Sequence, residues 1–332
     1  MKRVARYLLL GWFLLAAGCG GDDRPEEDAR ATGPATLLFA ASEGGRGWDI
    51  YVENVVTGTR TNLTNTPSTA TSELDDRSPT LSPDGSMIAY TSTADNPSDG
   101  LVGEEIFVMR RDGSKQRRLT DDDDVDVQPQ WTPKGRIFFT NCPSSQEAVP
   151  GCGLDLILPD GSGRQTIVGN IGLAFGVSLS PGGDRIAYAG LDETLQPLGL
   201  FVRRLDSAEG ERIGEGGSPQ WSPDGDRIAF LSERDENGRC LFRECVGHAP
   251  ELYLADADGS SERRLTETSA VESFAGWTPD GEWILFSRIR DEEDDYDVYA
   301  VRADGSCEVQ VTDTEAWEWS ATWSGSTESL DC

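Results

Sequence analysis

The 332-residue sequence predicts an all-β fold, a six-bladed β-propeller with four antiparallel strands in each blade. Three observations predict it: a repeated Ser/Thr-Pro-Asp-Gly type of segment, a repeated Asp-Gly-Ser turn followed by a stretch ending in Leu-Thr, and apolar alternation between them. Alternation is typical of strands, because successive side chains in a strand point to opposite faces. Four short strands in roughly 40–50 residues is the pattern of propeller blades.

The first repeated segment joins two strands through a tight turn. In each of its five copies, a proline ends the first strand, and the glycine two residues later supplies the positive φ that a tight hairpin needs. A short strand ending in Trp or Leu precedes each proline, and a strand such as residues 227–230 follows it. The prolines are Pro83, Pro133, Pro181, Pro223 and Pro279.

The second half of each repeat predicts two more strands, such as those around residues 106–109 and 117–120. Counting these halves gives six blades. The first blade lacks its leading strand, since residues 36–40 match the second strand of the other blades. Residues 321–323 match a leading strand with no blade after it. We therefore expect this C-terminal strand to complete the first blade and close the ring, which protects sheet edges that otherwise promote aggregation.

The N-terminal segment has the organisation of a signal peptide. Lys2, Arg3 and Arg6 precede an apolar stretch, residues 7–17, that is too short to span a bilayer. The small residues before Cys19 resemble a lipobox, which implies cleavage after residue 18 and lipidation of Cys19 in a bacterial lipoprotein. The alternative is an ordinary secretory signal followed by an incidental cysteine.

This organisation predicts three parts of the chain: a lipoprotein signal peptide (1–18), the lipidated cysteine with a flexible tether (19–35) and the propeller (36–332). The tether is small, charged and without apolar periodicity. The expected location is the bacterial cell envelope, anchored to a membrane on its periplasmic side or at the cell surface.

Six further cysteines support export. An even number in an exported chain indicates disulfides, although six cysteines allow 15 pairings. Local spacing favours the pairs Cys142–Cys152 and Cys240–Cys245, which leaves Cys307 to pair with Cys332. A metal site is disfavoured because the chain has no Cys-x-x-Cys pair.

Charge and composition exclude several functions. The 29 basic and 59 acidic residues give a net charge of -30, so phosphate backbones would be repelled and no nucleic-acid partner is expected. Because His248 is the single histidine, a catalytic or metal-binding site that needs two or more histidines is excluded. The chain has no Gly-x-Ser-x-Gly, Walker A or HExxH motif, so no catalytic residues are predicted.

The strand order predicts that the tight turns lie on one face of the ring, the short-turn face, and the long loops on the other, the wide-loop face. Long loops on a rigid scaffold are common binding sites. Acidic residues gather on the wide-loop face, either as a Ca²⁺ site or dock for a cationic partner, or as solvated loops that aid solubility. They are Asp75, Asp76, Asp121, Asp122, Asp123, Asp124, Asp126, Asp291, Glu292, Glu293, Asp294, Asp295 and Asp297.

The tryptophans fall into two groups. Those at one repeat position are expected to pack between blades; they are Trp131, Trp221, Trp277 and Trp323. Trp317 and Trp319 lie outside that register, and we expect them in a loop on the wide-loop face. They would either stack on a sugar or an aromatic partner residue, or pack at the seam of the ring.

The registered proline segments and their Asp-Gly turns resemble the WD40-like (PD40) repeats of the TolB-like β-propeller family, over about residues 36–325. TolB carries an additional α/β domain before its propeller, whereas only the short tether is expected here, so TolB's own role in the Tol–Pal system is not expected to carry over. Pectin-degrading lyase propellers resemble the repeat too, but they use several histidines around a metal.

Three functions follow from these observations. The first is a monomeric, non-enzymatic, lipid-anchored module that binds an envelope protein or polymer through its acidic wide-loop face. The second is a carbohydrate-active propeller, a glycan binder or polysaccharide lyase, with Ca²⁺ as its candidate cofactor. The third is a structural lipoprotein without a specific ligand.

Overall fold

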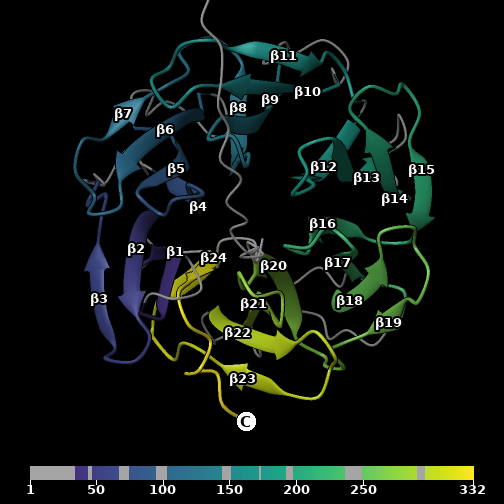
Figure 1. The fold of residues 1–332 in the computed structure, drawn as a ribbon. Coiled ribbons are helices and arrows are strands. Elements are labelled where there is room, and N and C mark those ends of the chain that lie inside the picture. Colours follow the sequence, from purple (N-terminus) through teal and green to yellow (C-terminus); the bar gives the residue numbers. More distant parts are fainter. Residues whose placement is uncertain are drawn as a thin grey trace, which may run out of the picture.

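The computed structural model describes residues 34–43, 47–66, 75–94, 103–143, 151–171, 173–191, 197–235, 249–289 and 296–332. These residues form six four-stranded antiparallel sheets, arranged as the blades of a ring (Figure 1). The predicted six-bladed β-propeller is therefore confirmed. None of the described residues forms a helix of the length and hydropathy needed to cross a membrane.

The strands of each blade are given from the centre of the ring outwards. Blade 1 contains β24 (Trp317–Ser324), β1 (Thr36–Ser42), β2 (Asp49–Asn54) and β3 (Thr59–Asn62). Blade 2 contains β4 (Asp76–Leu81), β5 (Met87–Ser92), β6 (Glu105–Arg110) and β7 (Arg117–Arg118). Blade 3 contains β8 (Val125–Trp131), β9 (Ile137–Cys142), β10 (Gly153–Ile157) and β11 (Gln165–Val168).

Blade 4 contains β12 (Leu173–Leu179), β13 (Arg185–Leu191), β14 (Pro197–Arg204) and β15 (Glu211–Gly214). Blade 5 contains β16 (Gly217–Trp221), β17 (Arg227–Ser232), β18 (Glu251–Asp256) and β19 (Arg263–Arg264). Blade 6 contains β20 (Val271–Trp277), β21 (Trp283–Ile289), β22 (Asp297–Arg302) and β23 (Glu308–Gln310).

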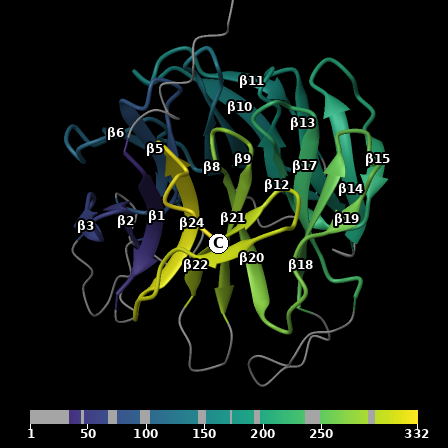
Figure 2. The ribbon, with the colours of Figure 1, turned by 60° about the horizontal axis from the view of Figure 1, so that its bottom comes forward.

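The ring closes where the two ends of the propeller meet. β24 pairs antiparallel with β1, with Thr36 opposite Ser324 and Leu37 opposite Trp323. Figure 2 shows the yellow β24 beside the purple β1. The C-terminal strand thus completes blade 1, as predicted from the repeats. Each of the other five blades is built from four consecutive strands of the described chain.

The described residues include two disulfides. Cys307 lies between β22 and β23 and is bonded to Cys332, so the segment after β24 is tied to blade 6. Cys142 at the end of β9 is bonded to Cys152 just before β10, with the two Cα atoms 4.3 Å apart. Both pairs are among the three predicted from the sequence. Cys240 and Cys245 lie outside the described residues, as do Cys19 and His248.

Each hydrophobic cluster joins two neighbouring blades. In one of them, Leu252 and Leu254 of blade 5 pack with Ile284 and Phe286 of blade 6. The repeated tryptophans add hydrogen bonds between inner strands: the indole Nε1 of Trp131 donates to the carbonyl of Thr80, 3.2 Å away in the preceding blade. Trp221 and Trp277 donate in the same way to Ser178 and Gln220. The prediction that these tryptophans pack between blades is confirmed.

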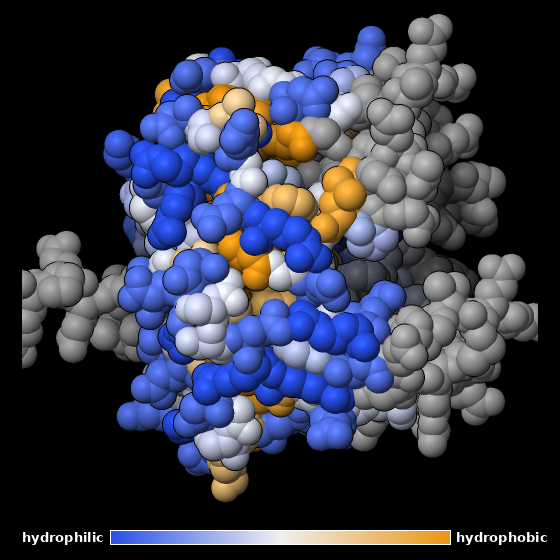
Figure 3. All heavy atoms as spheres, turned by 90° about the vertical axis from the view of Figure 1, so that its right-hand side faces the viewer, coloured by the Kyte–Doolittle hydropathy of each residue, from blue (hydrophilic) through white to orange (hydrophobic). Residues whose placement is uncertain are grey.

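The outer rim is mostly polar. Figure 3 shows the side of the ring that carries β14 and β15, where hydrophilic residues surround small and separate hydrophobic patches. Large apolar side chains are exposed at a few described positions, and two of them, Trp317 and Trp319, belong to one strand.

Deletion of residues 320–332 should destabilise the whole propeller, because it removes most of β24 and the cysteine that holds its end. We expect a large fall in melting temperature, or loss of a single cooperative transition, measured by circular dichroism. The control is Cys307→Ala with Cys332→Ala, which removes the crosslink but keeps the strand and should cost about 3 kcal/mol. An unchanged melting temperature after the deletion would show that closure does not stabilise the ring.

Candidate functional site

The inner strands share a backbone irregularity where they face the centre of the ring. Four non-glycine residues adopt positive φ there: Ser78 (52°), Gln128 (56°), Ser218 (50°) and Ser320 (55°). Each sits at a β-bulge, where the pairing with the next strand shifts register. A left-handed non-glycine residue costs about 1–2 kcal/mol, and such residues concentrate at functional sites.

Blade 4 has a glycine at the equivalent bulge for a steric reason. Gly176 has φ of 60°, and a Cβ atom added to it would lie 2.8 Å from the Cα atom of Ser218 in blade 5. Blades 4 and 5 therefore approach each other closely at the centre.

These bulges line a central cavity of about 550 Å³. Its walls come from the inner strands of all six blades and combine apolar side chains such as Val177 with side-chain hydroxyls and amides, including Ser78, Gln128, Gln220 and Thr322. Arg77 is the one charged residue among the described residues of the lining. The cavity thus offers many neutral hydrogen-bonding groups and little charge.

Four aromatic side chains form a row at the wide-loop end of this cavity, which we call the aromatic ledge: Trp48, Trp319, Tyr296 and Trp317. Trp48 meets Trp319 edge-on with ring centroids 6.1 Å apart, Tyr296 stacks on Trp319 at 5.7 Å, and Trp317 meets Tyr296 edge-on at 5.9 Å. Trp48 and Trp319 also line the cavity, so the ledge and the cavity are continuous.

The expectation that Trp317 and Trp319 lie in a loop is wrong. Both belong to β24, which starts four residues earlier than the repeated motif indicates. Because side chains two positions apart in a strand share a face, both indoles project on the same side, and each is 41% exposed. They form an exposed aromatic surface and also contact residues at the seam of the ring.

An ion pair borders the ledge. Arg77 donates to the Asp75 carboxylate at 2.6 Å, and its guanidinium carbon lies 5.8 Å from the centroid of the Trp48 ring. The other Asp75 oxygen accepts from the backbone N–H of Trp48 at 3.1 Å. Asp75, one of the predicted acidic residues, therefore positions Trp48 and neutralises the cation beside it.

Other predicted acidic residues also have structural partners. Asp76 and Asp297 lie at the starts of β4 and β22 and are buried, rather than in solvated loops. Asp76 accepts from the Thr66 hydroxyl at 2.6 Å, and Asp297 accepts from the Gln310 amide at 3.0 Å. Asp121, Asp122 and Asp123 are exposed in the loop before β8, and Asp124 is half-buried. The remaining ones, Asp291, Glu292, Glu293, Asp294 and Asp295, lie outside the described residues.

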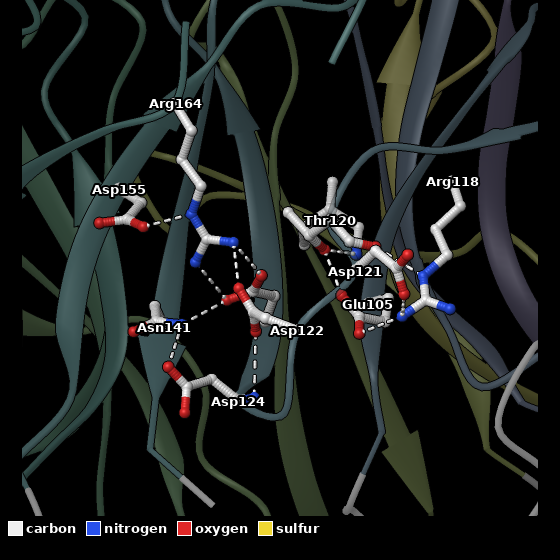
Figure 4. Close-up of polar contacts among 11 residues, drawn as sticks. Glu105, Arg118, Thr120, Asp121, Asp122, Asp124, Asn141, Asp155 and Arg164 are labelled. Carbon is white, nitrogen blue, oxygen red and sulfur yellow. Dashed lines mark hydrogen bonds and ion pairs between the residues drawn. The ribbon is translucent and has the colours of Figure 1, made fainter. Parts of the chain in front are cut away.

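Arg164 gathers three carboxylates at the wide-loop end of blade 3 (Figure 4). It pairs with Asp122 at 2.6 Å, Asp155 at 2.7 Å and Asp126 at 3.1 Å. Asn141 donates a further hydrogen bond to Asp126 at 2.7 Å. Burial raises the pKa of Asp126 to about 6, and the bonds from Asn141 and Arg164 act in the opposite direction.

Neighbouring carboxylates in this region have the spacing of a metal site. One oxygen each from Glu105, Asp122 and Asp126 lies within 4.8 Å of the others. Glu105, however, already accepts from Arg118 and from the Thr120 hydroxyl, both at 2.5 Å, while Arg164 holds the two aspartates. A Ca²⁺ ion would have to compete with these arginines, so the cluster as built is an ion-pair network, and Ca²⁺ binding stays a prediction.

Arginines also pair with strand carboxylates in blades 1 and 6. Arg60 bonds to the buried Glu318 at 2.5 Å, and Arg288 bridges Glu272 at 2.7 Å and Glu308 at 2.5 Å. Burial raises the pKa of Glu272 to about 7. The strand acids therefore stabilise blade ends. Arg60 and Arg164 come from equivalent positions at the outer edges of blades 1 and 3, whereas Arg288 comes from the second strand of blade 6.

The sequence analysis missed Trp48, Tyr296 and Arg77. The sequence does contain a pattern that marks Trp48 and Tyr296. Each directly precedes the aspartate that begins the third strand of its blade, Asp49 in blade 1 and Asp297 in blade 6. Their approach to Trp319 depends on the closure of the ring, which places these two blades side by side.

Arg164→Met should lower the free energy of unfolding by about 3 kcal/mol, because Asp126 and Asp155 are buried and would lose their cation. The matched control is Arg204→Met, which breaks the exposed pairs with Asp184 and Asp206 and should leave the free energy of unfolding nearly unchanged. Urea titration of both variants measures the difference, and equal effects would contradict a structural role for Arg164.

Known proteins share parts of this chain. It is 29% identical to tricorn protease homolog 1 of Streptomyces coelicolor over 69% of its length, which is 19% of that protein. It is 28% identical to the uncharacterized protein Atu1656 of Agrobacterium fabrum over 45% of its length and 52% of that protein. A 67-residue segment is 39% identical to the uncharacterized peptidase YuxL of Bacillus subtilis, covering 8% of it. The chain thus spans about half or less of these relatives.

Solved structures share the fold. A protein assigned as TolB from Agrobacterium tumefaciens superposes with a TM-score of 0.60 over 88% of this chain and 99% of that one, at 15% identity. The hydrazine synthase of Kuenenia stuttgartiensis gives a TM-score of 0.65 over 90% of this chain and 48% of that one, at 16% identity. TolB from Acinetobacter baumannii gives 0.54 over 88% and 83%, at 15% identity.

The family model described as the TolB beta propeller domain, PD40, matches residues 153–330, more than half of the chain. The match begins in blade 3 and extends through β24, and the first two blades repeat the same strand order and turns. The chain therefore belongs to the PD40 family of TolB-type β-propellers.

Proposed function

We propose that this protein is a non-enzymatic binding propeller, held at a bacterial membrane by a lipid on Cys19, whose ligand binds at the aromatic ledge and the adjoining cavity. The observation that carries the proposal is that exposed indoles adjoin a concave cavity with both polar and apolar walls, at one end of the ring. Concave sites with aromatic walls and a few polar groups are the usual form of binding sites.

Disulfides support an exported protein, because they persist in oxidising compartments. The relatives that are named as peptidases or proteases are far longer than this chain, and the shared segments cover 8% and 19% of them. A peptidase activity is therefore not part of the proposal.

The placement of the anchor suits a binding role. β1 begins at Thr36 on the short-turn face, where Arg111 from the turn between β6 and β7 donates to the Thr36 hydroxyl at 2.8 Å. A tether from Cys19 would therefore join the propeller at the face opposite the ledge.

Trp319→Ala should abolish most ligand capture. The full lipidated chain would be crosslinked in envelopes of its source bacterium, and the captured material quantified for wild type and variant. Central aromatic anchors typically cost 2 kcal/mol or more when truncated, so we expect at least about a tenfold loss. The control is Val56→Ala, which removes a 70% exposed side chain from the turn between β2 and β3 on the opposite face. Equal capture by both variants would contradict a site at the ledge.

Cys19→Ala should move the protein from the membrane fraction to the soluble fraction, because the acyl chains provide the anchor. Cell fractionation with immunodetection measures this, and an unchanged melting temperature would confirm that the propeller itself is intact. Retention of the variant in the membrane fraction would contradict lipid anchoring at this residue.

A further inference from the structure

We infer that the aromatic ledge binds an uncharged glycan chain, with sugar rings stacked on the aromatic faces and sugar hydroxyls bonded to the cavity wall. The inference rests on the proposed function and names the ligand class of the same site.

The ledge has the form that a sugar chain requires. A pyranose presents a face of C–H groups and a rim of hydroxyls, and indole and phenol rings pair an apolar face with a polar edge. Tyr296 stacks on Trp319, and Trp48 and Trp317 meet their neighbours edge-on, so the four rings hold one another in place. The parts of Trp317 and Trp319 that stay exposed, 41% of each, are the surface that sugar rings would contact.

The strand that carries the ledge is fixed in advance. Glu318 lies between Trp317 and Trp319 and is fully buried on the other side of β24, where it accepts from Arg60 at 2.5 Å and from the Thr314 hydroxyl at 2.8 Å. Because this residue is held inward, its two neighbours must project outward on one side. Such preorganisation reduces the entropy lost on binding.

The adjoining cavity offers neutral donors and acceptors. Hydroxyl and amide side chains such as Ser78, Gln128, Ser218 and Ser320 can both donate and accept, as sugar hydroxyls do. Arg77, the cation described in the lining, is already paired with Asp75 at 2.6 Å. A charged ligand would find no unpaired countercharge among the described residues of this wall.

Charge around the ledge also favours an uncharged ligand. Among the described residues, four carboxylates close to the aromatic side chains already accept hydrogen bonds from protein donors: Asp49, Asp75, Asp297 and Glu318. A basic peptide would therefore have to displace those donors. The exposed Asp313 and Glu315 precede β24, and the net charge of -30 repels acidic polysaccharides.

The test is titration calorimetry of the full mature chain with hexamers of β-1,4-N-acetylglucosamine, β-1,4-glucose, β-1,3-glucose and α-1,4-glucose. We expect at least one to bind with a dissociation constant below about 1 mM, with a change in tryptophan fluorescence. Trp317→Ala and Trp319→Ala should weaken it at least about tenfold, Trp319→Tyr should weaken it less, and Val56→Ala should have no effect. Melting temperatures of all variants establish that they fold.

Three results would overturn the inference. They are no measurable binding of any of the four hexamers, binding that neither tryptophan substitution weakens, or preferential binding of hexagalacturonate or hexalysine. The envelope capture experiment tests the proposed function separately. If Trp319→Ala abolishes capture while the neutral hexamers stay silent, the ledge binds another class of ligand and only the glycan inference fails. If capture is also unaffected, both fail.

Discussion

Pairing of β24 with β1 is the constraint on which the rest of the structure depends. It converts a row of blades into a ring, and only a ring has a central cavity. The same pairing builds the ledge, because Trp317 and Trp319 lie in β24 and Trp48 follows β1. The candidate site is therefore made from the two ends of the propeller, and it forms only when the ring has closed.

Much of the acidic excess has a structural use. A buried carboxylate is costly unless charged or polar groups satisfy it, and the blades meet this need with an arginine at the wide-loop end. Arg164 in blade 3 and Arg60 in blade 1 also lie over phenylalanine rings, with guanidinium carbons 5.1 and 4.8 Å from the ring centroids of Phe139 and Phe39. These arginines close the ends of the blades against water while the exposed acids keep the surface soluble.

Most of the fold follows from the sequence because turns and alternation are local signals that recur. The prolines and Asp-Gly pairs mark the hairpins, and the unmatched strand near residue 321 reveals the closure. The site is less predictable. Trp317 and Trp319 precede the repeated motif, so their membership of β24 has no counterpart in the other copies. Arg60 and Arg164 occupy equivalent repeat positions, but Arg288 lies in the second strand of its blade, so periodicity finds only part of the role that they share.

The geometry of the seam also sets how the ring responds to force. Thr36 lies opposite Ser324, so the first residue of β1 and the last of β24 are at the same end of one antiparallel pair. Tension applied between these two points would open the pair one hydrogen bond at a time, which is the weakest loading direction for a sheet. The bond from Cys332 to Cys307 changes the path of that load, because a pull on the C-terminus passes into blade 6 and bypasses β24. The disulfide therefore protects the strand that closes the ring from a force applied at the C-terminus.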